Sequence, residues 1–338
     1  MDADREMVNK AHLSAYRFVI LAGTSKAATT SVYTYLATHP QICPAEKETR
    51  FFLDANYPLA SKTRFQNNGP ATYLSLFQSG PPENWRLEAT PDYLYSPNTP
   101  NFIRQTLANV SLIFILREPI SRLLSWYRFA RRINVIPHDM TFDEYVGIQR
   151  HDSNRFADRD HPAFYALEQG RYSVYLRRYL ELFGESRVYV RFYENLRHDA
   201  RAFMVSICRW VCIDEAHFRD FRFDVVNKGS DAVLHSQFLH KLYVQSHDRA
   251  RYLVRHTPKL RLLLRRIRPS ADAMYQKMNL GKRRQLTMSA ATKEFLLSYY
   301  NEESTRLRQM LGLDVPWPSN PANALAGVRI NLSDERGR

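Results

Sequence analysis

Residues 23–31 combine a lysine with several hydroxyl side chains, directly after an apolar run at residues 18–22. If a helix begins in this segment, its unpaired backbone N–H groups and partial positive charge form an anion site. Lys26 would add a full charge, and its small neighbours would let a phosphate approach the backbone. The candidate phosphate-binding residues are Ser25, Lys26, Ala27, Ala28, Thr29, Thr30 and Ser31. An ordinary Ser/Thr helix cap beside a solvated lysine has the same composition, so that alternative stays open.

The three cysteines are Cys43, Cys208 and Cys212. Cys208 and Cys212 lie four residues apart and would share one face of a helix, as a metal-binding pair does. No further Cys or His lies nearby in the sequence to complete four zinc ligands, so we interpret both as buried small hydrophobes. Three cysteines are also too few for a disulfide framework. We therefore expect no metal site.

Apolar runs that alternate with helical patterns must position the candidate residues. Strands are expected at residues 18–22, 85–89, 111–116 and 187–192. Helices are expected at residues 28–38, 119–132, 174–183 and 199–211, with one long helix at 286–311. Strands that alternate with helices predict an α/β fold with a central, mainly parallel sheet flanked by helices.

The chain is expected to form one domain, over residues 16–318, between an N-terminal extension (1–15) and a loose tail (319–338). Within the domain, the polar and only partly periodic residues 134–169 are interpreted as an insertion on the substrate side. Residues 249–268 carry eight Arg or Lys and no acidic residue, and they form a separate basic segment.

Residues 23–31 do not form a Walker A loop, because the lysine precedes the small residues instead of following a second glycine. With Lys47-Glu48-x-x-Phe51-Phe52 further on, they resemble the 5′-phosphosulfate motif of sulfotransferases that use 3′-phosphoadenosine 5′-phosphosulfate (PAPS). Residues 116–127 resemble the 3′-phosphate motif of that family, and residues 88–93 its Glu-x-[Ser/Thr]-Pro-x-Tyr segment. The similarity is strongest to the branch that acts on carbohydrates and bacterial small molecules. It implies the P-loop-kinase-like sulfotransferase fold.

This resemblance implies how the donor would be bound. Lys26 would contact the oxygen that bridges sulfur and phosphate, and residues 29–31 would hold the 5′-phosphate together with neighbouring N–H groups. Arg117 and Ser125 match the pair that binds the 3′-phosphate, where an arginine offers a forked and permanently charged contact. PAPS would be the donor and PAP (3′-phosphoadenosine 5′-phosphate) the product, with no metal involved.

Two further parts of the chain match the family less distinctively. Asn227, Lys228 and Gly229 match a late loop that closes over PAPS in relatives, and a short polar turn explains them equally well. Tyr172, in the segment Gly170-x-Tyr172, is assigned to donor binding by the resemblance, with a core aromatic residue as the alternative.

The acceptor hydroxyl must lose a proton during transfer. In glycan-acting relatives the Glu of the Lys-Glu-x-x-Phe-Phe segment is the general base, and Glu48 holds that position. An ion pair of Glu48 with Lys47 or Arg50 is the structural alternative. Lys47, Glu88 and Asp92 are candidates for binding the acceptor. Ala89 stands where some animal glycan sulfotransferases carry Lys, which weakens any transfer of heparan-type specificity.

The formal net charge of +14 favours an anionic partner without choosing one. The basic segment 249–268 could bind an anionic membrane or an acidic polymer, or form a solvated helix. A P-loop nucleotide kinase is the rival enzyme, and an anionic-surface-binding homologue is the rival without activity. The missing Walker lysine argues against the kinase. The presence of Lys26, Glu48, Arg117 and Ser125 argues against a homologue without activity.

The sequence shows no secretory signal and no apolar run of ~20 residues, so we expect a cytoplasmic protein with possible peripheral membrane contact. The expected partner is a small-molecule or glycan acceptor, and no nucleic acid. A carbohydrate or glycolipid is the first choice of acceptor, and a polyketide or other natural product the second. The oligomeric state is left open.

Overall fold

The computed structural model describes residues 13–59, 61, 63–151, 161–224, 232–234, 274, 280–283, 286–317 and 329–331. Its centre is a five-stranded sheet with the order β2-β3-β1-β4-β5, and each neighbouring pair in this sheet is parallel. The strands are β1 (Arg17–Gly23), β2 (Ile42–Pro44), β3 (Trp85–Ala89), β4 (Val110–Leu116) and β5 (Val188–Phe192). The predicted α/β fold with a mainly parallel sheet is therefore confirmed. Strand β2 is missing from the sequence predictions because three residues are too few to form a recognisable apolar run.

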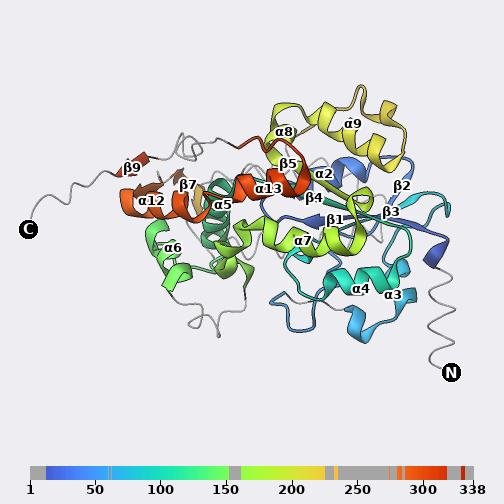
Figure 1. Cartoon of the computed structure of the whole chain (residues 1–338), viewed down its shortest axis with the longest axis horizontal. Helices are drawn as coiled ribbons and strands as arrows, with labels where there is room; N and C mark the ends of the chain where they lie inside the picture. Colours follow the sequence, from blue (N-terminus) through green and yellow to red (C-terminus); the bar gives the residue numbers. More distant parts are fainter. Residues whose placement is uncertain are drawn as a thin grey trace, which may run out of the picture.

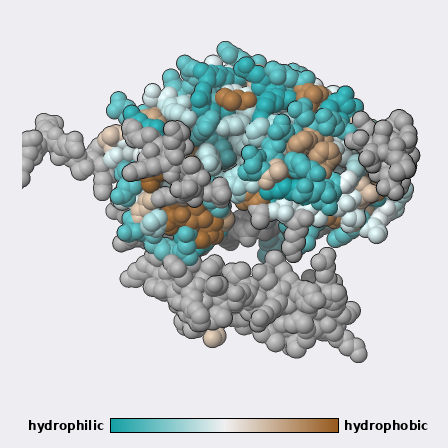
Figure 2. Space-filling model, turned by 90° about the horizontal axis from the view of Figure 1, so that it is seen from below, coloured by the Kyte–Doolittle hydropathy of each residue, from teal (hydrophilic) through white to brown (hydrophobic). Residues whose placement is uncertain are grey.

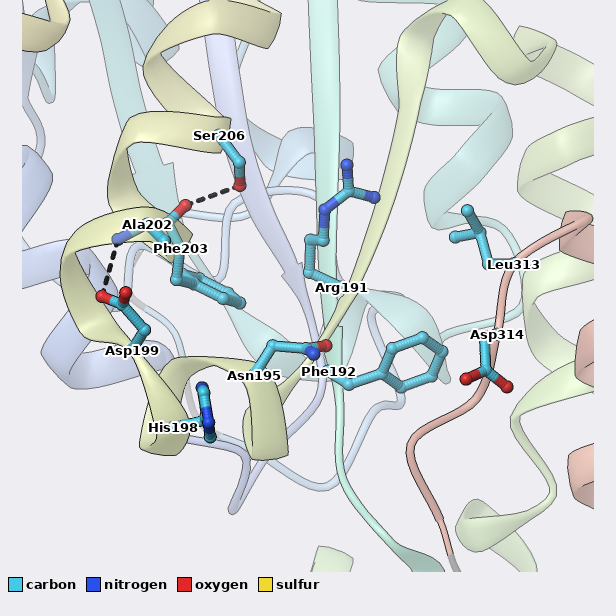
Figure 3. A pocket seen from close by; sticks show the side chains of 10 residues that line it. All are labelled: Arg191, Phe192, Asn195, His198, Asp199, Ala202, Phe203, Ser206, Leu313 and Asp314. Atoms are coloured by element: carbon cyan, nitrogen blue, oxygen red, sulfur yellow. Dashed lines mark hydrogen bonds between the residues drawn. The ribbon is translucent and has the colours of Figure 1, made fainter.

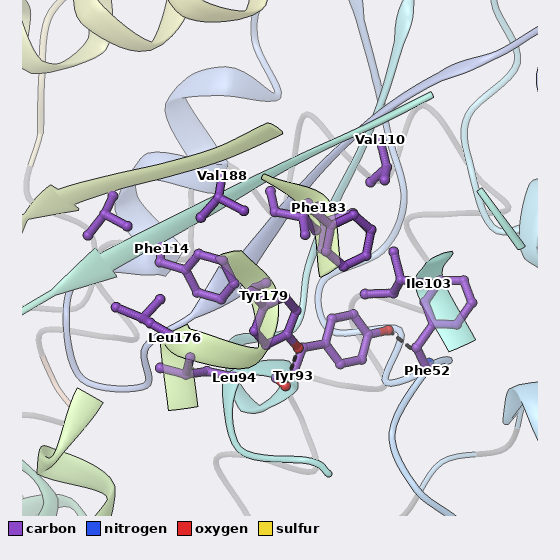
Figure 4. Packing of buried hydrophobic residues seen from close by; sticks show 14 of the residues in the cluster. Phe52, Tyr93, Leu94, Ile103, Val110, Phe114, Leu176, Tyr179, Phe183 and Val188 are labelled. Atoms are coloured by element: carbon purple, nitrogen blue, oxygen red, sulfur yellow. Dashed lines mark hydrogen bonds between the residues drawn. The ribbon is translucent and has the colours of Figure 1, made fainter. Parts of the chain in front are cut away.

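Helices cover both faces of this sheet (Figure 1). One face carries α2 (Thr29–Leu36), α8 (Tyr193–His198) and α9 (Ala200–Val211), and the other carries α3 (Pro70–Ser75), α4 (Thr99–Thr106) and α7 (Tyr172–Phe183). Successive residues of a strand point to opposite faces, so Val19 packs in one apolar cluster and Ile20 in the other. Figure 4 shows the second cluster, where Phe114 of β4 lies against Tyr179 of α7. Burial on both faces explains why the central strands are apolar throughout.

A third apolar cluster lies beside the sheet and contains residues of α5 (Pro119–Arg132), α6 (Phe142–His151) and α12 (Ala290–Tyr299). Apolar residues from the described part of the segment interpreted as an insertion, residues 134–169, contribute to this cluster. Its residues Phe142 and Tyr145 pack against Tyr127 of α5. The described part of the segment thus supports α5, and α5 in turn carries part of the candidate site.

The prediction of one long helix at 286–311 is wrong. The structure has a short strand, β8 (Thr287–Ser289), then α12 and a separate helix α13 (Glu303–Leu311). Ser289 begins α12 because its side chain accepts a hydrogen bond from the Thr292 N–H. The break before α13 lets Glu303 turn inward, where its carboxylate accepts bonds from the N–H and the hydroxyl of Ser173 at 2.7 and 2.9 Å. Apolar periodicity alone did not reveal this buried contact.

Several of the predictions fall outside the described residues, namely Asn227, Lys228, Gly229 and the basic segment 249–268. In the tail at 319–338 the structure describes only β9 (Arg329–Asn331), which pairs in parallel with β8. Cys208 is buried in α9, whereas Cys212 is exposed, so the buried-hydrophobe interpretation is wrong for Cys212. No cluster of three or more metal-ligating side chains occurs among the described residues.

The described surface is mainly hydrophilic in the view of Figure 2. Within the described residues, none of the helices combines the length and apolar character that crossing a bilayer requires.

Candidate active site

A cavity of about 550 Å³ is lined by residues that directly follow β1, β3, β4 and β5. The carboxyl edge of a parallel sheet is where α/β proteins bind their ligands. The structure brings together on this wall most of the residues that the sequence singled out. They are Ser25, Lys26, Ala28, Thr29, Thr30, Ser31, Lys47, Glu48, Asp92, Arg117 and Ser125.

The loop between β1 and α2 turns sharply to reach this cavity. Lys26 and Ala28 both have positive φ angles, of 72° and 63°. Gly23 is required at the end of β1, because an added Cβ would lie 2.9 Å from the Phe114 ring. Helix α2 begins after Ala28 without any side-chain capping hydrogen bond. The Ser/Thr-cap alternative therefore fails, and the first N–H groups of α2 face the cavity region as an anion site would require.

Lys26 points along α5. Its Nζ lies 3.7 Å from the ring centre of Phe129 and 5.7 Å from that of Trp126. Burial, followed by the repulsion of the nearby cations Arg132 and Arg117, lowers the pKa of Lys26 to about 7. A lysine in such surroundings is poised to gain a proton when an anion arrives.

Arg117 leaves β4 beside this lysine. Its Nη1 donates to the carbonyl of Lys26 at 3.1 Å, and its guanidinium carbon lies 4.6 Å from the ring centre of Tyr193. Its buried Nε has no hydrogen-bond partner in the described part of the chain. Because a buried donor without an acceptor is costly, this atom is suited to a ligand oxygen.

Helix α5 presents one face to the cavity. Ser125, Trp126, Phe129 and Arg132 follow the spacing of three to four residues that aligns side chains along a helix. The helix begins at Pro119, and the Glu118 carboxylate accepts bonds from the next free N–H groups, of Ile120 at 2.9 Å and Ser121 at 2.7 Å. This cap holds the start of α5 directly after Arg117.

Two carboxylates lie on the cavity wall in different surroundings. Glu48 is paired with the Lys47 ammonium at 2.8 Å and with Arg50 at 3.5 Å. Asp92 is 5% exposed, and it accepts hydrogen bonds from the hydroxyls of Tyr57 at 3.1 Å and Ser25 at 3.3 Å. Burial, followed by the negative charge of Glu48, raises the pKa of Asp92 to about 6.

Glu88 does not line the cavity. It is fully buried behind it, where its carboxylate accepts bonds from Thr49, Tyr73 (2.6 Å), Tyr93 (2.6 Å) and Thr90 (3.0 Å). This cage of four hydroxyls takes up both carboxylate oxygens. The assignment of Glu88 to acceptor binding is therefore corrected to a structural role.

Tyr172 and Ala27 also lie outside the cavity wall. Tyr172 is fully buried, and its hydroxyl donates to the carbonyl of Arg117 at 2.7 Å. Any contribution of Tyr172 to donor binding is thus indirect, through the position of Arg117. Ala27 is fully buried, where its small size suits the tight loop.

The wall also contains residues that the sequence did not single out, namely Arg50, Trp126, Arg128, Phe129, Arg132, His161 and Tyr193. Helical spacing from Ser125 could have indicated the members on α5. His161 lies in the segment at 134–169, which the sequence placed on the substrate side without assigning this histidine a role. Its Nδ1 accepts the N–H of Ala163 at 3.1 Å, and burial lowers its pKa, so its neutral form carries the proton on Nε2.

A smaller cavity of about 350 Å³ lies near α8 and α9 (Figure 3). Its wall includes Arg191, His198, Asp199 and Asp314. Asp199 is used as the cap of α9, where it accepts the N–H of Ala202 at 2.9 Å. None of the predicted site residues lines this cavity.

Comparison with known proteins identifies the family of the chain. The model of the sulfotransferase domain matches residues 17–252. The chain therefore belongs to the sulfotransferase family. The solved structure of a sulfotransferase from Alicyclobacillus acidocaldarius covers 89% of this chain and 97% of its own, with a TM-score of 0.59 and 20% identity. That likeness confirms the fold.

Curated relatives match shorter parts of the chain. The membrane-associated sulfotransferase kil1 of Dictyostelium discoideum is 37% identical over 114 residues, which is 33% of this chain and 22% of the relative. The mouse bifunctional heparan sulfate N-deacetylase/N-sulfotransferase 4 is 25% identical over 205 residues, which is 58% of this chain and 22% of the relative. The match thus spans about a fifth of the length of these relatives.

Proposed function

We propose that this chain transfers a sulfuryl group from PAPS to a hydroxyl group, most readily that of a carbohydrate or glycolipid. The observation that carries the proposal is the cationic cavity at the carboxyl edge of the sheet. There, Lys26 and Arg117 lie next to the uncapped start of α2.

The cavity residues suit a highly charged anion. The cations on the wall are Lys26, Lys47, Arg50, Arg117, Arg128 and Arg132, against the two carboxylates Glu48 and Asp92. The low pKa of Lys26 reflects burial and the repulsion among these cations. Donor phosphates would relieve this repulsion, and they would supply an acceptor for the Arg117 Nε.

The chemistry then follows from position and charge. Lys26 stabilises the negative charge that grows on the oxygen bridging sulfur and phosphate, while residues 29–31 and the α2 N–H groups hold the 5′-phosphate. Arg117 and Ser125 bind the 3′-phosphate. Glu48 is the first candidate for the base that accepts the hydroxyl proton. Lys47 orients the Glu48 carboxylate through their ion pair.

The proposed acceptor class is supported by the resemblance and by relatives that are heparan sulfate sulfotransferases. Ala89, where some glycan sulfotransferases carry Lys, argues against the same polymer. A polyketide or other natural product remains the second candidate. A location in the cytoplasm, with the segment 249–268 contacting an anionic membrane, is also a proposal.

A binding experiment tests whether the chain uses PAPS as its donor. Calorimetry should show that PAP binds far more tightly than ATP, because ATP lacks the 3′-phosphate that Arg117 and Ser125 would hold. Tighter binding of ATP would favour the nucleotide-kinase alternative. Incubation with labelled PAPS and a panel of glycans, glycolipids and polyketides then identifies the acceptor.

Replacement of Lys26 tests the transfer step itself. Lys26→Ala should lower turnover by roughly 10²–10³-fold, as does the loss of one donor to a developing oxyanion. Sulfated product is measured from labelled PAPS. A turnover close to that of the wild-type protein would contradict the role of Lys26.

A further inference from the structure

The second carboxylate of the cavity, Asp92, lies just past the end of β3, where Pro91 begins a short 3-10 turn. It is 5% exposed and shares the cavity wall with Glu48 and Lys26. A carboxylate buried this far carries a desolvation cost, which a purely structural role would offset with cationic or backbone partners.

The side chains that hydrogen-bond to Asp92 in the described part of the chain are instead neutral hydroxyls. Tyr57 donates to Oδ1 at 3.1 Å and Ser25 donates to Oδ2 at 3.3 Å. Ser25 belongs to the phosphate-binding loop, directly before Lys26, so Asp92 lies against the donor side of the site. Each oxygen keeps capacity for one more hydrogen bond.

Glu48 differs in this respect. Its two oxygens are paired with two cations, Lys47 at 2.8 Å and Arg50 at 3.5 Å. Adding a proton to Glu48 would forfeit both ion pairs. Adding a proton to Asp92 would relieve its repulsion with Glu48 and its desolvation.

The charged and titratable groups that face Asp92 act in opposite directions. Glu48 raises its pKa, Arg50 and the hydrogen bond from Tyr57 lower it, and Tyr95 also lies close enough to interact. Burial has the largest effect, and together with Glu48 it outweighs the groups that lower the pKa of Asp92, which is raised from 3.8 to about 6. A general base works best when its proton affinity is close to that of the medium.

We propose that Asp92 receives the proton of the acceptor hydroxyl, in place of Glu48, which the family resemblance names as the base. The inference rests on the proposed sulfuryl transfer. As the hydroxyl oxygen bonds to sulfur, the bond between sulfur and the 5′-phosphate oxygen breaks and its electron pair stays on that oxygen. The hydroxyl proton ends on the Asp92 carboxylate, while Glu48, held by Lys47 and Arg50, orients the hydroxyl.

The pH dependence of kcat/KM with PAPS and the acceptor tests this assignment. In the wild-type protein, activity should fall as the pH drops through about 6, because Asp92 becomes protonated. Asp92→Asn should lower kcat by roughly 10²–10⁴-fold and abolish this fall in activity, which is the acid limb of the pH profile. Its affinity for PAP should stay within about threefold of the wild-type affinity. Glu48→Gln should keep the limb and move it to lower pH, because the repelling charge is gone.

Tyr57→Phe is a milder variant that serves even if Asp92→Asn folds poorly. It removes one hydrogen bond that lowers the pKa of Asp92, so the acid limb should move to higher pH. Glu88→Gln is the matched control, since Glu88 is an equally buried carboxylate off the cavity wall. It should leave the position of the limb unchanged.

Titration of the Asp92 carboxyl by carbon-13 NMR in the free protein gives a readout without turnover, and a midpoint near 6 is expected. An Asp92→Asn protein that keeps its kcat and its acid limb would overturn the inference. So would a limb that vanishes in Glu48→Gln alone. A wild-type protein that transfers no sulfuryl group would instead count against the proposed function, and the NMR midpoint would still report on Asp92.

Discussion

Lys26 shows how strongly one side chain depends on its surroundings. Its sequence position indicated a cation beside a phosphate. The structure adds that the ammonium is mostly buried, lies 3.7 Å from the Phe129 ring centre and shares the cavity with Arg132 and Arg117. Burial and like charges together lower its pKa to about 7. The free protein therefore holds this lysine partly neutral at neutral pH, and an anionic ligand should restore its charge.

Proton uptake should accompany the binding of PAP. At pH 8, one unit above the Lys26 pKa of about 7, about 0.9 proton should be taken up per PAP if the bound lysine is fully charged. Uptake should decrease below pH 7, where the free lysine already carries its proton. Calorimetry in two buffers of different ionisation enthalpy measures this number. Lys26→Met is the control, and equal uptake in that variant would assign the proton to another group.

At the scale of elements, α5 connects the two halves of the proposed donor site. Arg117 directly precedes it, Ser125 lies on its cavity face, and Phe129 further along contacts Lys26. The place where α5 begins is therefore a functional property. It depends on Pro119, which suits the first helical position, and on the Glu118 cap.

Loss of this cap should affect stability and donor binding together. Glu118→Ala should lower the free energy of unfolding by about 1 kcal/mol, since two N–H groups lose their acceptor. PAP affinity should also fall several-fold, because Arg117 and Ser125 flank the cap. Denaturant unfolding and PAP calorimetry measure the two effects.

Helix α6 offers a matched control. Glu144, in the first turn of α6, accepts the N–H of Thr141, the residue before the helix, at 2.7 Å, and it does not line the cavity. Glu144→Ala should lower stability without changing PAP affinity. If both variants leave PAP affinity unchanged, the Glu118 cap does not position the donor site.

At the scale of the whole molecule, a buried arginine joins the donor loop to the C-terminal helices. The fully buried Arg122 donates to the Ser25 carbonyl at 3.1 Å, to the Ala166 carbonyl at 3.0 Å and to the Gln169 side chain at 3.1 Å. Next to Gln169, Gly170 lies against Tyr300, at the end of α12. The C-terminal helices therefore brace the segment that holds Arg122.

The contact between Gly170 and Tyr300 leaves no room for a side chain. An added Cβ at Gly170 would lie 2.6 Å from the Tyr300 hydroxyl, so Gly170→Ala should lower the free energy of unfolding by about 1–3 kcal/mol. Gly147 in α6 is the matched control, because a Cβ there meets nothing within 4 Å. Gly147→Ala should be neutral or raise stability by up to about 1 kcal/mol. Equal effects of the two variants in thermal unfolding would contradict the packing argument.

Local sequence determined the elements whose signals are contiguous. The limits predicted for β3 and α5 agree with the structure, β4 and α9 differ from their predictions by one residue at one end, and β1 differs by one residue at each end. Each has a continuous apolar run or helical period beside a proline, a glycine or a polar turn. The region 286–311 was misjudged because the inward turn of Glu303 depends on Ser173, far away in the chain.

The sequence by itself therefore determined the family, four of the five strands of the central sheet, and many of the residues that line the cavity, because these lie in short motifs next to strand ends. Only the tertiary structure decided which carboxylates face the cavity. Glu88 and Asp92 lie four positions apart, and packing places one in a cage of hydroxyls and the other on the cavity wall. The tertiary structure also decided that His161 lies on the cavity wall and that the pKa of Lys26 is lowered. Burial and the distances between charges arise from parts of the chain that meet only on folding.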